Sequence, residues 1–173
     1  MVRSYLSNVN VQKMKTDKDV KGLIKALKDK NNWSIRERIA MALGDLGEPV
    51  IEPLVHLLKD KDWIIRMYAS RALGKIGKPA LESLIKALND EHWKVRMYAS
   101  RALGKIGDTW AVDALIQTLN DKHNSVRSEA AIALGKIGDK RAVEPLMKAR
   151  QYTDRYTREV VKEALKKIRT KKT

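Results

Sequence analysis

The chain has 173 residues, 33% of them charged, and carries a formal net charge of +15. It contains no cysteine, which excludes disulfide bonds and thiolate sites. No apolar run approaches the length of a transmembrane helix, and the first residues lack the apolar block of a signal peptide. We therefore expect a cytoplasmic protein with no membrane partner.

A repeated segment organises the whole chain. The twelve residues RMYASRALGKIG occur without change at 66–77 and at 96–107, and related signatures end at Gly47 and Gly138. In a repeat array each unit buries its apolar side against its neighbours and leaves a long surface, which favours binding over catalysis. The expected parts are a leader or capping helix at 1–16, repeats at 17–47, 48–77, 78–107, 108–138 and 139–169, and a basic tail at 170–173.

Each repeat contains two helical patterns. In the first half, apolar residues recur at positions 0, 3, 4 and 7, as in residues 81–88. In the second half, apolar or small residues recur at positions 0, 4, 7, 8 and 11, as in residues 65–76, which predicts a helix with a slim packing face. We therefore expect an all-α fold, an α–α superhelix (solenoid) of about five helical hairpins.

Glycine and proline positions mark the expected helix ends. The glycines that close the signatures, such as Gly77, suit a positive φ just past a helix C-terminus. Pro53 and Pro145 fall inside the first helices and predict a kink or a late start there. The fifth repeat carries Arg150 where the others have Leu, which predicts a cap with one side facing water. Residues 9–16 are expected to form a short helix over the first repeat.

The repeat resembles a known family. Its length, the Asp that precedes an Arg by six residues, and the segment Ala-x-x-Ala-Leu-Gly-x-Ile-Gly are similar to HEAT repeats. The closest subtype is the short HEAT-like repeat of phycobilisome (PBS) bilin lyases. The resemblance implies a solenoid whose second helices line a concave surface. The family includes bilin lyases, an iron-dependent hydroxylase of a modified lysine, DNA-repair glycosylases and plain scaffolds, so it leaves the function open.

The charged turn residues allow two interpretations. The pairs are Asp60 with Arg66, Asp90 with Arg96, and Asp121 with Arg127. Either the arginines form an anion-binding row, or each forks onto an Asp and turn carbonyls and so builds a structural ladder. A residue pair that recurs with the repeat serves the stacking of repeats, which favours the structural ladder.

The second helices present candidate binding side chains opposite their apolar stripe. The expected ridge is Met67, Tyr68, Arg71, Lys75, Met97, Tyr98, Arg101 and Lys105, with Trp63 and Trp93 just before these helices. Methionine adapts to partners, and Tyr and Arg are common anchor residues, although a recent duplication would also leave two nearly identical repeats. The tryptophan column, which includes Trp33, either grips a partner or covers the turns. Packing is favoured, and Trp110 is expected to pack as well.

Nucleic acid is the main rival partner. The residues that would meet phosphates are Lys75, Lys105, Lys136 and Lys167. Acidic residues, among them Glu159 and Glu163, lie on or beside the same surface and weaken this interpretation. The positive charge is also concentrated in the leader, the fifth repeat and the tail, where it can serve solubility alone.

Enzyme chemistry finds little support. His92 and His123 occupy equivalent turns, yet no carboxylate column accompanies them as metal ligands. The hydroxylase relatives carry His-Glu dyads, and here only the reversed Glu91-His92 occurs. We therefore expect no catalytic residue, no metal and no cofactor. The sequence favours a non-catalytic scaffold for protein–protein interaction, with nucleic-acid binding as the alternative and a bilin-lyase-like or other enzymatic accessory role third.

Overall fold

The computed structural model describes residues 8–151 and 154–170, which form α-helices and short 3₁₀ turns and contain no β-strand. Contacts divide the chain into two compact units, residues 1–80 and residues 81–173. The first seven residues of the expected leader and residues 171–173 of the tail lie outside the described residues. In the described ranges, no helix combines the length and the apolar character that crossing a membrane requires.

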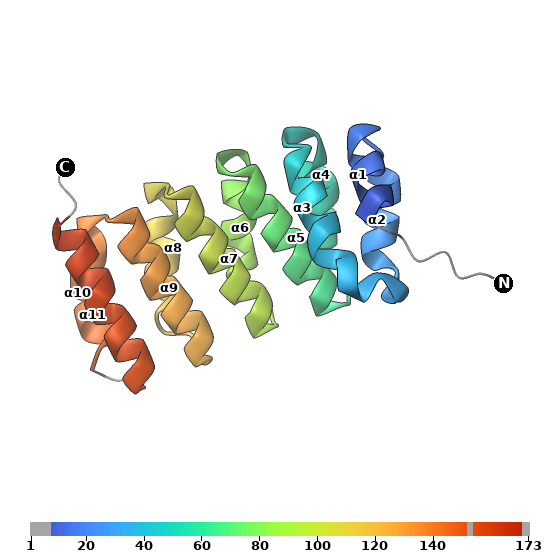
Figure 1. Ribbon diagram of the computed structural model, residues 1–173. Helices are drawn as coiled ribbons and strands as arrows, with labels where there is room; N and C mark the ends of the chain where they lie inside the picture. Colours follow the sequence, from blue (N-terminus) through green and yellow to red (C-terminus); the bar gives the residue numbers. More distant parts are fainter. Residues whose placement is uncertain (1–7, 152–153, 171–173) are drawn as a thin grey trace. The chain divides into compact units, whose positions relative to one another are not determined.

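The first unit contains one short helix followed by two helical hairpins (Figure 1). Its helices are α1 (Asn8–Thr16), α2 (Val20–Lys28), α3 (Arg36–Asp45), α4 (Ile51–Leu57) and α5 (Trp63–Ile76). Helix α2 pairs with α3, α4 pairs with α5, and the second helices α3 and α5 pack against each other. Helix α1 lies where the sequence predicts a short helix, and it packs against α2 and α3.

The second unit contains three hairpins (Figure 1). Its helices are α6 (Leu81–Ala87), α7 (Trp93–Ile106), α8 (Val112–Thr118), α9 (Asn124–Ile137), α10 (Val143–Ala149) and α11 (Arg155–Thr170). In each hairpin the short first helix packs against the long second helix. The second helices pack in series, α7 on α9 and α9 on α11. This series places their side chains on one continuous surface.

Local signals set the helix ends. The Asp62 carboxylate accepts a hydrogen bond from the Ile64 backbone N–H at 2.9 Å and so caps the start of α5. Gly77 follows α5 with φ +93, which confirms the positive φ predicted for the signature glycine just past a helix end. Pro53 and Pro145 are each the third residue of an α-helix that a 3₁₀ turn precedes. Proline is tolerated there because the first-turn N–H groups have no partner within the helix.

The first glycine of the signature has a different role from the second. A Cβ atom placed on Gly104 would lie 2.6 Å from the Cα atom of Ala133 on the neighbouring helix. A Cβ atom on Gly135 would lie 2.8 Å from the Cα atom of Ala164. Helices α7, α9 and α11 therefore approach each other through small residues, as the slim face of the pattern predicts.

The apolar core follows the two predicted patterns. Leu84, Leu115 and Leu146 are fully buried and come from the three first helices of the second unit. Leu103 and Leu134 come from the second helices and are also fully buried. Burying a leucine side chain contributes about 1.5–3 kcal/mol, so the contacts between adjacent helices dominate the stability. The outer sides of both the first and the second helices remain outside this core.

Candidate partner-binding surface on the second helices

In the second unit, a tyrosine and an arginine form a fixed cluster on α7. The Arg101 guanidinium lies 5.2 Å from the centroid of the Tyr98 ring. It also donates hydrogen bonds to both carboxylate oxygens of Glu129 on α9, at 3.1 and 2.8 Å. The hydrogen bond to Glu129 raises the pKa of Arg101 further above its ordinary value. The side chain is therefore a permanent, positioned cation that remains half exposed.

The first unit repeats this arrangement with different partners. The Arg71 guanidinium lies 5.9 Å from the Tyr68 ring centroid and contacts the Glu37 carboxylate. Lys75 lies 2.5 Å from the Asp45 carboxylate, which also contacts Lys15 at 2.8 Å. Hydrogen bonds from Lys15 and Lys75 lower the pKa of Asp45. Lys75, the first member of the expected lysine row, is thus partly neutralised.

The structure separates the methionines and lysines of the expected ridge. Met67 is buried, with only 8% of its surface exposed, so it offers little to a partner. Met97 is partly buried, and Lys105 is exposed. Lys136 on α9 and Lys167 on α11 are exposed as well. The two methionines at equivalent positions, Met67 and Met97, therefore differ in solvent exposure.

The four tryptophans differ in how far their side chains are exposed to solvent. Trp93 is partly buried and stacks on the His123 ring, with ring centroids 3.9 Å apart and planes at 5°. Trp63 is partly buried, whereas Trp33 is 73% exposed. The prediction that Trp110 packs is wrong, because 82% of its surface is exposed. Trp110 lies in the 3₁₀ turn Thr109–Ala111. In this turn the buried side chain is that of Ala111, not that of Trp110.

The turn arginines contact both their own repeat and the next one. Arg96 donates to the backbone carbonyls of Asp90 and Glu91, at 2.7 and 2.9 Å. It also forks onto the Asp121 carboxylate of the following repeat, at 2.5 and 2.8 Å. Burial raises the pKa of Asp121, but the hydrogen bond from Arg96 helps to outweigh burial, and the net pKa is lowered. This geometry is the one that the structural interpretation requires.

The other two turn arginines also donate to backbone carbonyls of their own turns. Arg66 donates to the backbone carbonyls of Asp60 and Lys61, at 2.7 and 3.2 Å. Arg127 donates to the Asp121 carbonyl at 2.8 Å and lies 3.6 Å from the Asp154 carboxylate. These contacts use the guanidinium groups within the fold and leave less of them for an external anion.

A hollow on the second-helix side was not found from the sequence. It has a volume of about 220 Å³ and lies between α9 and α11. Its lining consists of apolar Ile132, Val160 and Ala164 together with Glu159, Glu163 and Lys167. One signal was present: Ile132 occupies the column that holds Arg71 and Arg101 in earlier repeats. An isoleucine among arginines at an outward position indicates a local apolar site.

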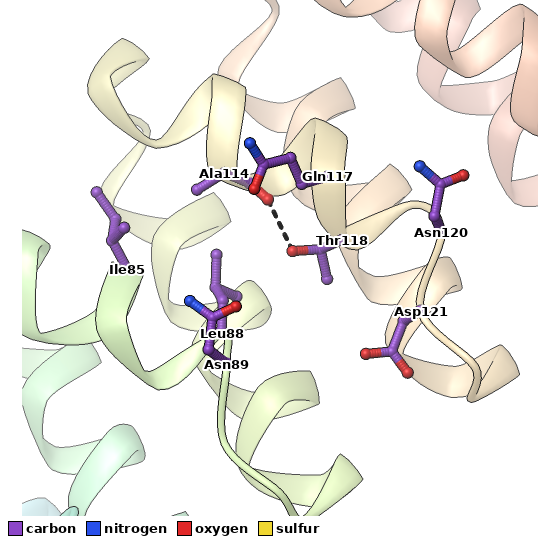
Figure 2. Close-up of a pocket in the computed structure, with 8 residues that line it drawn as sticks. All are labelled: Ile85, Leu88, Asn89, Ala114, Gln117, Thr118, Asn120 and Asp121. Carbon is purple, nitrogen blue, oxygen red and sulfur yellow. Dashed lines mark hydrogen bonds between the residues drawn. The ribbon is translucent and has the colours of Figure 1, made fainter.

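A second hollow lies on the side of the first helices, between α6 and α8 (Figure 2). It has a volume of about 320 Å³, and its polar lining includes Asn89, Gln117 and Asn120. The Thr118 hydroxyl donates to the Ala114 carbonyl at 2.8 Å and is therefore engaged within α8. Asp121 at its edge is the carboxylate held by Arg96. This hollow thus offers neutral amide groups rather than a charged or reactive site.

The histidines do not form a metal site with carboxylates. The His92 ring nitrogen Nδ1 accepts a hydrogen bond from the Lys94 backbone N–H at 3.3 Å and caps α7. His123 stacks on Trp93. Among the residues that the structure describes, no group of three or more His, Cys, Asp or Glu could hold a metal ion.

A chain of helical hairpins whose second helices pack in series is an α-helical repeat protein. Residues 20–85 and 81–166 match the family model described as HEAT repeats, so the chain belongs to the HEAT-repeat family. No curated protein matches the chain. The family assignment establishes the kind of repeat and the fold.

Several solved structures share this fold. An engineered protein is 24% identical with a TM-score of 0.63, over 95% of this chain and 85% of that chain. The complex of CpcE and CpcF of phycocyanin lyase from Nostoc sp. PCC7120 gives 24% identity and a TM-score of 0.69, over 86% of this chain and 64% of that chain, which is less than two thirds of its length. A designed armadillo repeat protein in complex with the peptide (KR)4 gives 19% identity and a TM-score of 0.57, over 94% of this chain and 87% of that chain.

Proposed function

We propose that the chain is a non-catalytic HEAT-repeat scaffold that binds a segment of another protein through its second helices. In the second unit the proposed contact surface, called here the second-helix surface, consists of Met97, Tyr98, Arg101, Lys105, Ile132, Lys136, Glu159, Glu163 and Lys167. In the first unit, Tyr68 and Arg71 are proposed to extend the same function. The observation that carries the proposal is the apolar-floored hollow between α9 and α11.

The hollow supplies what an anchor residue of a partner needs. Apolar side chains of Ile132 and Val160 remove an incoming apolar group from water, which contributes about 25 cal/mol per Å² buried. The charged side chains of Glu159 and Glu163, which also line the hollow, keep this surface hydrated when no partner is bound. A small pocket of this kind surrounded by charged groups matches the arrangement of binding hot spots in protein interfaces.

The neighbouring Tyr98 and Arg101 strengthen the proposal. Tyrosine and arginine are enriched among residues that dominate binding energy. Arg101 is already held by the Tyr98 ring and the Glu129 carboxylate, so a partner would not need to order it. Ordering a flexible side chain at an interface costs about 0.5–1.5 kcal/mol. Preorganisation therefore favours binding at this position.

The lysine row is a weaker candidate for nucleic-acid binding. Lys75 contacts Asp45, and Lys167 lines the same hollow as Glu159 and Glu163. Carboxylates that pair with a lysine or outnumber it locally weaken its attraction for phosphate groups. Only Lys105 and Lys136 remain as exposed members of the row outside these acidic surroundings. The second-helix surface therefore favours a protein partner.

The proposal is tested with peptides selected from a random displayed library against the unaltered chain. Their dissociation constants are then measured by calorimetry for Ile132→Glu and for Met147→Glu. Met147 is an exposed apolar residue on the first helix α10 and serves as the matched control. We expect Ile132→Glu to weaken binding by at least about tenfold, which corresponds to about 1.4 kcal/mol, and Met147→Glu to leave it within about twofold. Equal affinities for both variants would reject the proposed surface.

A further inference from the structure

Three arginines near the C-terminal end of the second unit differ from the four arginines that precede them in this unit. Arg96, Arg101, Arg127 and Arg141 each pair with a carboxylate. Within the described ranges, no carboxylate lies within ion-pair distance of Arg150, Arg155 or Arg158, and all three are exposed. Guanidinium groups that the fold does not use are free to contact an external anion.

These three arginines meet at one place. Together with Lys162 and Glu159 they line a hollow of about 430 Å³ between the end of α10 and the first turns of α11. Glu159 is the single acidic residue of this lining, and its contact with Lys162 is long, at 3.7 Å, and exposed. Four cations thus surround a space that contains one carboxylate.

The Asp154 carboxylate stands close by in sequence but is occupied. It accepts hydrogen bonds from the Thr157 hydroxyl at 2.6 Å and from the Thr157 backbone N–H at 3.0 Å, which caps α11. It also lies 3.6 Å from Arg127 of the preceding repeat. Asp154 therefore belongs to the helix cap and to the ladder of turn arginines.

The cations continue along α11 as a stripe. Residues 155, 158, 162, 166 and 169 are Arg, Arg, Lys, Lys and Arg, and all are exposed. Their spacings of three or four residues place them on one side of the helix. At 1.5 Å per residue the stripe is about 21 Å long, and neighbouring cations are about 4.5–6 Å apart along the helix axis. This group, with Arg150, is called the basic stripe.

Capping of the array does not by itself explain the basic stripe. A terminal repeat needs polar side chains on its outer side, but either sign of charge would serve. Like charges three or four residues apart on a helix repel each other and destabilise it, and Glu159 and Glu163 on α11 offset this repulsion only in part. Arg150 also stands where Leu88 and Leu119 are buried in earlier repeats. A polyanionic ligand would offset the repulsion between these accumulated positive charges.

We propose that the basic stripe binds the sugar-phosphate backbone of a nucleic acid. A row of cations over about 21 Å engages several regularly spaced phosphates, whereas a single phosphate group would contact only one or two of them. The contacts are to phosphates, so the binding is independent of base sequence. The site differs from the lysine row of the second-helix surface and does not depend on Ile132 or its hollow.

The test measures binding of a fluorescently labelled 20-base-pair DNA duplex by anisotropy at several salt concentrations. The variant replaces Arg155, Arg158 and Lys162 with alanine. The control variant loses the same number of positive charges, by alanine substitution of three exposed lysines that lie outside the basic stripe: Lys122, Lys140 and Lys148. Each lost phosphate contact reduces the slope of log affinity against log salt by about 0.9. We expect a slope that is shallower by about 2–3 and an affinity at least tenfold weaker for the stripe variant.

The control should keep the slope of the unaltered chain and lose less than about threefold in affinity. Thermal unfolding by circular dichroism checks that both variants are folded. Equal losses in both variants would show that net charge alone drives binding and would overturn the proposal. So would a dissociation constant of the unaltered chain weaker than about 100 μM at low salt. Vesicles containing phosphatidylserine provide a further comparison, and equal affinity for them with the same loss in the stripe variant would also contradict it.

Discussion

Replacing Gly104 with alanine tests how closely the second helices must approach. The new Cβ atom would lie 2.6 Å from the Cα atom and 2.7 Å from the Cβ atom of Ala133. Carbon atoms in favourable contact are about 3.5–4.0 Å apart, so α7 and α9 must separate by about 1 Å or distort. Such overpacking costs about 1–3 kcal/mol. Alanine recovers about 1 kcal/mol through its higher helix propensity.

Because the clash is with the backbone of Ala133, which cannot rotate away, the overpacking cost lies in the upper part of this range, at about 2–3 kcal/mol. The net expectation is a loss of about 1–2 kcal/mol in the free energy of unfolding. For a chain of this size each kcal/mol lowers Tm by about 2–4 °C. Denaturant unfolding followed by circular dichroism measures the free energy, and Lys136→Ala on the exposed side of α9 serves as the control. An unchanged or raised stability for Gly104→Ala would refute the inferred close approach.

Two further predictions concern the turns. Asp121→Asn leaves the buried Arg96 without its anionic partner and should cost about 3 kcal/mol at pH 7. Because the pKa of Asp121 is lowered in the folded chain, its contribution is present above about pH 4 and is lost as the pH falls further, so urea titrations of the Asn variant should depend less on pH below 4. A parallel pH dependence of both proteins would contradict this. Trp93→Ala should cost about 1–3 kcal/mol through loss of its stacking on His123, whereas Trp110→Ala should change stability by less than about 0.5 kcal/mol. Equal costs would show that exposure does not distinguish these tryptophans.

Much of the fold could be predicted because a repeat array records its contacts in a fixed period. The spacing of Leu84 and Leu115 within their repeats indicates which side of each first helix is buried. Gly77 indicates a helix end because a positive φ strongly favours glycine. These signals are local and recur in each repeat, so they predict the helices without knowledge of how neighbouring repeats pack.

The candidate site could be predicted less well, because it depends on contacts between repeats. Arg101 pairs with Glu129, which occupies the position of Tyr98 in the following repeat, so the contact joins two different positions of adjacent repeats. Met67 and Met97 are identical in sequence context but differ in burial, which neighbouring residues decide. The hollow at Ile132 also needs side chains from α11, so no single helix pattern indicates it.

Mapping a selected peptide onto the chain by NMR would test the proposed function most directly. The chain is labelled with ¹⁵N, and amide shifts are recorded as the peptide is added. The account predicts that the largest changes cluster on α7, α9 and α11, around Arg101, Ile132 and Glu163. Changes confined to the first helices α6, α8 and α10 would contradict the claim that the second helices bind the partner.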